Sequence, residues 1–132
     1  MLRVCFATGD GIVVDQHFGR CDRFDVYGLT AREAVLVASR LVAPAGDDEG
    51  DRITGRLDAV RDCAILHVAD IGGSAAARVV NAGVHPLKVP SGSPVDALTV
   101  RLQGVLAGTP PPWLRKVLRG HDPAVVPAWR PR

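Results

Sequence analysis

The stretch DGIVVDQHFGRCDRF (10–24) places chemically capable side chains between two short apolar runs. His17 and Cys21 lie four residues apart, with Arg20 and Arg23 close to both. Imidazole and thiolate are good ligands for iron, and guanidinium groups attract anions. Two ligands do not complete a structural zinc centre, which needs four. The pattern leaves three interpretations open: a surface hairpin, a metal site, or a site for an anionic ligand.

A second candidate site lies where an apolar run ends and the sequence continues Asp70-Ile71-Gly72-Gly73-Ser74. Glycines let a backbone approach a ligand closely, and the first turn of a following helix presents free N–H groups and a positive dipole end. These properties would bind an anion. A tight turn between strand and helix explains the same residues, so spacing alone does not separate the two interpretations.

Two aspartates suggest a different chemistry. Asp10 and Asp70 both follow predicted strands, and paired carboxylates can hold metal ions for phosphodiester hydrolysis. Each is equally explained as a turn residue that makes local hydrogen bonds. Nucleotide binding is disfavoured, because the Gly9-Asp10-Gly11 run has Val14 where a dinucleotide fingerprint needs glycine, and the sequence contains no phosphate-binding loop.

The remaining histidines and cysteines fit structural roles better. His67 lies inside a nearly continuous apolar run, where a hydrogen-bonded core imidazole is expected, and His85 begins another strand away from the candidate sites. Cys5 and Cys63 fall in predicted core strands, where thiols behave as small apolar groups.

Composition excludes several classes of protein. The chain has 132 residues, enough for one domain with a real core, and 47% of them are apolar. Its net charge of +2, from 16 basic and 14 acidic residues, argues against a general binder of nucleic acid or membrane surfaces. Three cysteines without a CxxC pair, and no signal or membrane segment, favour a soluble cytoplasmic protein with free thiols.

The periodicity of the apolar residues predicts an α/β order of elements. Strands are expected at 2–8, 12–14, 24–29, 63–69 and 84–89, and helices at 51–61, 72–83 and 93–108, with a short basic helix after the turn at 109–114. The run 31–42 fits a helix by its alanines and a strand by its alternation, and we favour the strand. Ser93 is a suitable N-cap for the helix at 93–108. Too many prolines and too little apolar periodicity predict a frayed tail at the C-terminus.

This order predicts a mixed sheet with antiparallel early strands, parallel later strands and helices on both faces. Parallel strands bring their carboxyl ends to one rim of the sheet, where open α/β sheets bind ligands. The segments 8–10, 70–74 and 90–93 would meet at that rim.

Three segments together resemble one known family. DQHFG (15–19), IGGSAAARVVNAGVHPLKV (71–89) and PPPWL (110–114) are similar to the NifX family of nitrogenase cofactor-biosynthesis proteins, whose domain also occurs in NifY and at the C-terminus of NifB. The resemblance covers roughly residues 2 to 119, and the glycine–alanine and proline–tryptophan segments carry most of its specificity.

The resemblance implies a ribonuclease-H-like three-layer fold with a five-stranded mixed sheet and helices on both faces, formed by residues 1–119. The tail expected from the composition is then the flexible segment 120–132. It implies a non-enzymatic protein that binds the iron–sulfur precursor made by NifB, or the finished iron–molybdenum cofactor. NifB and the NifEN scaffold are the implied partners. A NifY-like chaperone of cofactor-free dinitrogenase is the alternative, and a metal-dependent nuclease is a distant one.

The resemblance also bears on the site. It makes His17 the implied cofactor ligand, and it leaves open whether Cys21 is a second one. With the anion-binding argument above, the predicted cofactor-binding residues are His17, Phe18, Gly19, Arg20, Cys21, Gly72, Gly73 and Ser74.

Overall fold

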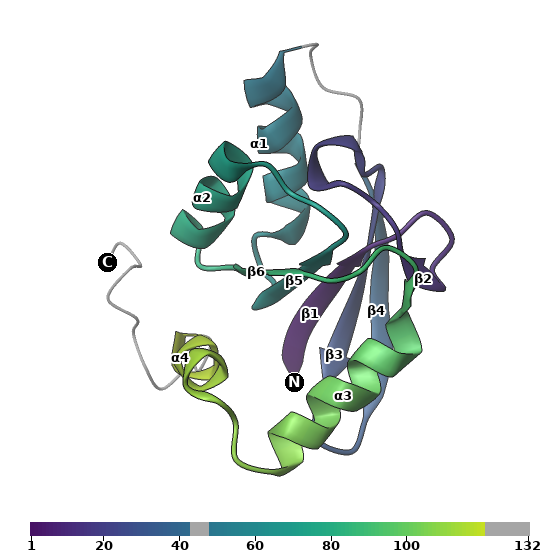
Figure 1. Cartoon of the computed structure of the whole chain (residues 1–132), viewed down its shortest axis with the longest axis vertical. Coiled ribbons are helices and arrows are strands. Elements are labelled where there is room, and N and C mark those ends of the chain that lie inside the picture. The colour runs from purple at the N-terminus through teal and green to yellow at the C-terminus, as the bar shows by residue number, and fades with distance from the viewer. Residues whose placement is uncertain (43–47, 121–132) are drawn as a thin grey trace.

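The computed structural model describes residues 1–42 and 48–120, so residues 121–132 of the predicted tail lie outside the described part (Figure 1). The elements follow in the order β1 (Leu2–Ala7), β2 (Val13–Val14), the 3-10 helix η1 (Phe18–Arg20), β3 (Arg23–Leu29), β4 (Ala34–Leu41), α1 (Glu49–Val60), β5 (Ile65–Val68), α2 (Gly73–Asn81), β6 (His85–Lys88), β7 (Ser93–Pro94), α3 (Val95–Ala107) and α4 (Pro112–Gly120). No helix in these described ranges is long and apolar enough to cross a membrane.

Five strands form a mixed sheet in the order β4-β3-β1-β5-β6. The β1–β3 and β3–β4 pairs are antiparallel, whereas β1–β5 and β5–β6 are parallel. The predicted mixed sheet is therefore confirmed, including the strand at 31–42 and the edge position of the strand that contains Pro86. A proline is tolerated there because the outer side of an edge strand needs no donor.

Helices cover both faces of the sheet (Figure 1). On one face, the side chains of α1 and α2 pack with those of β1, β3 and β5 in a core that includes Phe24, Leu57 and Val79. On the other face, α3 and α4 cover a second core that includes Phe6, Leu102 and Leu114. Burying apolar area on both faces is what makes a central sheet of this kind stable.

A short two-stranded sheet corrects one prediction. Val13 and Val14 of β2 pair with Pro94 and Ser93 of β7, so Ser93 is a strand residue and not the N-cap of α3. Its hydroxyl donates to the carbonyl of Pro90, and α3 begins at Val95 after Pro94. The tertiary pairing with β2 overrides the local capping preference.

Candidate functional site

The loop that carries His17 is tied to the carboxyl end of β5. The backbone N–H of Phe18 donates to the carbonyl of Asp70 at 2.9 Å, and the N–H of Ala69 donates to the carbonyl of Gln16 at 3.1 Å. These two bonds form a parallel bridge between His17 and Asp70. The histidine is thereby held beside the segment that leads into α2.

Two predicted site residues, Phe18 and Cys21, anchor the His17 loop in the hydrophobic core. Phe18 is fully buried and packs against Phe24, with ring centroids 5.9 Å apart. Cys21 is also fully buried, and its thiol donates to the carbonyl of Arg23 at 2.8 Å. Burial raises the pKa of Cys21 to about 11, so the thiol stays protonated at neutral pH. The structure therefore places Cys21 in the core and not in the cleft beside His17.

Arg56, which the sequence analysis did not single out, fastens the other side of the loop to α1. Its guanidinium is almost fully buried and donates to the carbonyl of Cys21 at 2.9 Å and to the carbonyl of Arg52 at 3.1 Å. A charge-assisted hydrogen bond in a buried setting holds its partners firmly. The Cys21 end of η1 and the first turns of α1 are thus fixed relative to each other.

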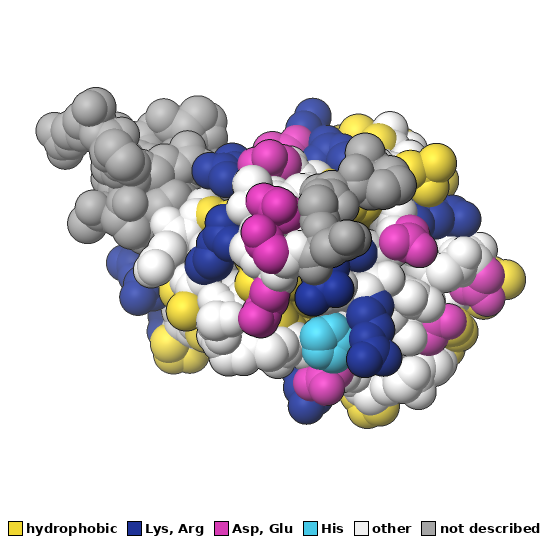
Figure 2. Space-filling view, turned by 90° about the horizontal axis from the view of Figure 1, so that it is seen from above, with side chains coloured by type: hydrophobic (Ala, Val, Ile, Leu, Met, Phe, Trp, Pro, Cys, Tyr) yellow, Lys and Arg dark blue, Asp and Glu magenta, His cyan; other side chains and the backbone are white. Residues whose placement is uncertain are grey.

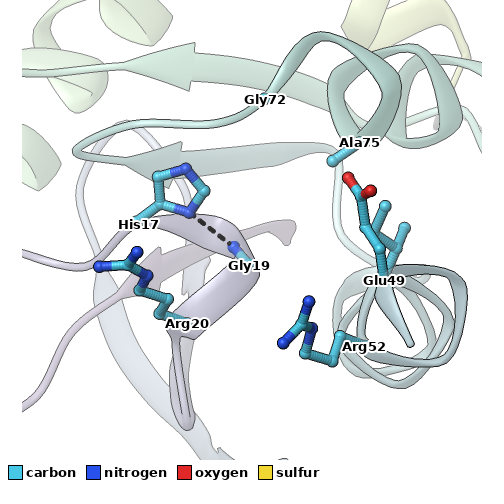
Figure 3. A pocket seen from close by; sticks show the side chains of 8 residues that line it. His17, Gly19, Arg20, Glu49, Arg52, Gly72 and Ala75 are labelled. Carbon is cyan, nitrogen blue, oxygen red and sulfur yellow. Dashed lines mark hydrogen bonds between the residues drawn. The ribbon is translucent and has the colours of Figure 1, made fainter. Parts of the chain in front are cut away.

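A cleft of about 230 Å³ opens between η1, α1 and the start of α2 (Figure 3). Its lining residues are His17, Gly19, Arg20, Glu49, Arg52, Ile53, Gly72 and Ala75. Figure 3 shows the His17 ring above η1 and Arg52 reaching from α1 into the space between the two elements. The structure therefore brings together two segments that the sequence singled out separately, and adds α1 to them.

The start of α2 leaves room at the cleft. Gly72 is the N-cap residue of α2, and no side chain caps the helix there. Neither Gly72 nor Gly73 has a positive φ, and a Cβ added at either would meet no atom within 4 Å. Glycine is therefore not required for the turn itself. Its effect is to leave the first N–H groups of the helix uncovered, which is the arrangement that binds anions.

The hydrogen bonding of His17 determines which of its two ring nitrogens carries the proton. His17 is the N-cap of η1, and its Nδ1 accepts from the backbone N–H of Gly19 at 3.0 Å. An N–H is only a donor, so in the neutral ring Nε2 carries the proton. The exposed nitrogen of His17 is consequently a hydrogen-bond donor in this conformation. Coordination of a metal through Nε2 requires the Gly19 bond to be given up.

The charge around the cleft is predominantly positive. Arg20 and Arg52 are exposed, and neither takes part in an ion pair among the described residues. Glu49 supplies the one carboxylate of the lining. Figure 2, which views the molecule from above, shows basic side chains next to a histidine on this face. Two guanidinium groups without an ion pair among the described residues, the Nε2–H of His17 and a helix N-terminus together suit an anionic ligand.

The predicted site residues thus separate into three groups. His17, Gly19, Arg20 and Gly72 line the cleft, Phe18 and Cys21 lie beneath it, and Gly73 and Ser74 are exposed in the first turn of α2. Sequence reasoning missed that α1 also lines the cleft, with the side chains of Glu49, Arg52 and Ile53. The one available signal was the pair of arginines four residues apart on the predicted helix, which share a face.

The two carboxylates that a nuclease would use, those of Asp10 and Asp70, are engaged in hydrogen bonds and an ion pair with neighbouring residues. Asp10 accepts from the N–H groups of Ile12 and Val13, which lower the pKa of its carboxyl group, and Asp70 pairs with Lys88 at 3.1 Å. No group of three or more metal-binding side chains occurs within residues 1–42 and 48–120. Both aspartates therefore act as turn and surface residues in this structure.

The two described histidines outside the His17 cleft both pack against aromatic rings. The ring of His67 stacks on Phe6, and its Nδ1 lies 3.1 Å from the carbonyl of Cys5. Burial lowers the pKa of His67 to about 4. His85 stacks on Trp113 at the far end of α2, with ring centroids 4.5 Å apart.

Comparison with known proteins identifies relatives of this chain. Residues 1–104 match the family described as dinitrogenase iron-molybdenum cofactor. The chain is 40% identical over 122 residues to protein NifY of Azotobacter vinelandii, covering 92% of this chain and 50% of that protein. It is 37% identical over 127 residues to protein NifX of Herbaspirillum seropedicae, covering 95% and 87%. This chain therefore spans about half the length of that NifY relative and most of that NifX relative.

Among solved structures, the crystal structure of PH0822 has a similar fold. It superimposes with a TM-score of 0.58 at 20% sequence identity, covering 78% of this chain and 89% of that one. At this identity the likeness concerns the fold alone.

Proposed function

Because the chain belongs to the dinitrogenase iron-molybdenum cofactor family, we propose that it carries a metal–sulfur cluster of nitrogenase cofactor biosynthesis between other proteins. The cargo is the NifB-made iron–sulfur precursor or the finished cofactor, and the NifB and NifEN proteins are the expected donor and acceptor. The protein acts by binding and release and not as a catalyst.

The observation that carries this proposal is the composition of the His17 cleft. Within the part of the chain that the structure describes, it offers one imidazole, two arginines that form no ion pair and a helix N-terminus without a side-chain cap, and no cysteine lines it. A metal–sulfur cluster is large and anionic, so hydrogen bonds and positive charge bind it well. A carrier that must release its cargo is better served by one potential iron ligand than by four cysteines.

The size of the cleft also suits transient binding. At about 230 Å³, it is smaller than the roughly 300–1,000 Å³ of a pocket that encloses a small molecule. A cluster seated there would keep much of its surface uncovered. The acceptor protein could then contact the cargo before the carrier lets go.

The test is an anaerobic titration of the purified protein with the NifB-made cluster, followed by the cluster's absorption spectrum and by gel mobility. We expect the wild type to bind and the His17→Asn variant to lose about tenfold or more in affinity. That loss corresponds to about 1.5–3 kcal/mol, the usual contribution of a hydrogen bond to a charged partner.

His17→Asn is the informative variant because asparagine can still accept the hydrogen bond of Gly19 as an N-cap. His17→Ala removes the imidazole and the cap together. If asparagine bound the cluster as well as the wild type does and alanine did not, the shape of η1 would matter and the imidazole would not. Equal binding by all three proteins would contradict the proposal.

A NifY-like chaperone that recognises cofactor-free dinitrogenase is the second candidate, supported by the 40% identity to a NifY protein. Complexes formed in anaerobic extracts of nitrogen-fixing cells separate the two. Association with NifEN or NifB supports the carrier, and association with apo-dinitrogenase supports the chaperone.

We further infer that the fold is of the ribonuclease-H type. The support is the sheet order β4-β3-β1-β5-β6, in which the first three strands of the main sheet are antiparallel neighbours and the last two are added in parallel. The three described cysteines are all free, which suits a reducing compartment, and we place the transfer in the cytoplasm.

A further inference from the structure

A second cleft lies at the opposite end of α2 from the His17 cleft. Its walls come from the end of α2, the start of β6 and α4, and its volume is about 600 Å³. The nine residues of α2 span about 13 Å at 1.5 Å per residue, which separates the two clefts. A partner that occupied the second cleft would leave the first one open.

The centre of this second cleft is a fixed aromatic side chain. Trp113 stacks on His85 with an interplanar angle of 18°, yet the tryptophan remains 37% exposed. The neighbouring Val80 is 55% exposed. A tryptophan that is already held in place loses little side-chain entropy on binding, and such residues dominate the affinity of protein interfaces.

The helix that forms one wall of the cleft, α4, is basic. Arg115, Lys116 and Arg119 are exposed on α4, which has no acidic residue, and none of the three belongs to an ion pair among the described residues. Lys116 lines the cleft itself, and the two arginines line a shallower hollow beside Leu118. An apolar centre with a charged rim is the usual anatomy of a protein–protein interface.

We propose that this surface, the Trp113 groove (Val80, Val84, His85, Trp113, Lys116 and Val117), docks an acidic segment of a partner protein that also carries apolar side chains. The apolar side chains would contact Trp113 and Val80, and a carboxylate would pair with Lys116 in the groove. Where the segment continues over α4, further carboxylates would pair with Arg115 and Arg119 in the neighbouring hollow.

The distribution of charge over the molecule supports an acidic partner. Helix α1, at the other end of the molecule, exposes charges of both signs, Glu49, Asp51 and Asp58 together with Arg52, whereas α4 exposes basic residues and contains no acidic one. Because α4 presents exposed charges of one sign among the described residues, it would attract an acidic segment during approach. A net charge of only +2 and an apolar groove make nucleic acid a poorer fit.

The experiment measures binding of a fluorescein-labelled, glutamate-rich peptide with two leucines to the full-length protein by fluorescence anisotropy. We expect binding that weakens as salt rises, because exposed charges are screened. Trp113→Ala should weaken it about tenfold or more, as expected for an interface anchor. Lys116→Glu should weaken it about threefold or more, because it replaces an attraction by a repulsion. A peptide with lysines in place of the glutamates should not bind.

Arg32→Glu is the matched control, since Arg32 is an exposed cation that does not line the groove. It should bind the glutamate-rich peptide like the wild type. Lys116→Glu keeps the test valid if Trp113→Ala disturbs α4 locally.

Several results would overturn the proposal. These are equal binding by the wild type and both groove variants, absence of binding, or stronger binding to an oligothymidylate or to anionic lipid vesicles than to the peptide. Binding that appears only after residues 121–132 are deleted would show that the chain's own C-terminal segment is the occupant.

Discussion

At the scale of single residues, the candidate site depends on the different surroundings of His17 and Cys21. The sequence places them four residues apart, and the 3-10 turn η1 sends them in opposite directions. His17 is exposed at the cleft, whereas Cys21 is sealed in the core with its thiol on a backbone carbonyl. Their spacing could suggest a pair of ligands. It could not show that Cys21 lies in the core together with Phe18 while His17 stays exposed.

Replacing the buried thiol tests this division of roles. We expect Cys21→Ala to lower the free energy of unfolding by about 1 kcal/mol, the typical effect of a small buried truncation. Cluster affinity should change by less than about twofold, or about 0.4 kcal/mol. The change is small because Cys21 does not line the His17 cleft. Denaturant unfolding and the anaerobic titration measure the two effects. A large loss of affinity with unchanged stability would show that the thiol reaches the cargo.

At the scale of elements, the cleft exists because three segments are fastened together. Backbone hydrogen bonds join the His17 loop to the end of β5, and the buried guanidinium of Arg56 joins that loop to α1. Apolar periodicity was sufficient to predict α1, α2 and the strand between them, β5. It could not predict that α1 contributes Arg52 and Glu49 to the site, because that depends on how α1 packs against η1.

The glycine at the start of α2 offers a test at this scale. We expect Gly72→Val to leave the thermal midpoint nearly unchanged, because a Cβ there meets no protein atom within 4 Å and φ is −70°. The branched side chain should nevertheless weaken cluster binding by about fivefold or more, since it would cover N–H groups that a bound anion needs.

Gly104→Val is the matched control for this change. Gly104 lies in α3, outside the His17 cleft, and a Cβ added there also meets no atom within 4 Å. Its cluster affinity should equal that of the wild type. If both variants bound the cluster normally, the start of α2 would not be part of the binding site.

At the scale of the whole molecule, the mixed sheet and the helical layer on each face followed from the order of the apolar runs along the sequence. The order of the strands within the sheet did not follow from that pattern. The places where prediction failed are those set by contacts between distant segments. Ser93 is the clearest case, since its pairing with Val14 moved the start of α3.

Stability of the whole fold should depend on pH through His67. Its folded-state pKa of about 4 lies below the 6.5 of an unperturbed histidine, chiefly because burial disfavours the charged ring. The unfolded chain therefore binds the proton more tightly. The contribution to stability is complete above about pH 6.5 and is lost as the pH falls toward 4, by up to about 3 kcal/mol.

Denaturant unfolding between these pH values measures the effect. His67→Gln is the control, because the amide can still donate to the carbonyl of Cys5 but does not titrate in this range. We expect the wild type to lose more stability on acidification than the variant does. Parallel pH profiles for the two proteins would show that His67 is not the group responsible.

The most direct test of the account is to locate the cluster on the protein by NMR of the uniformly ¹⁵N-labelled chain under anaerobic conditions. Binding of the NifB-made cluster should broaden or shift the backbone amide signals of Gly19, Arg20, Arg52, Gly72 and Ala75, and leave those of the Trp113 groove unchanged. The same experiment with His17→Asn should show little perturbation. Perturbations centred away from the His17 cleft, or identical perturbations in the variant, would contradict the claim that this cleft binds the cluster.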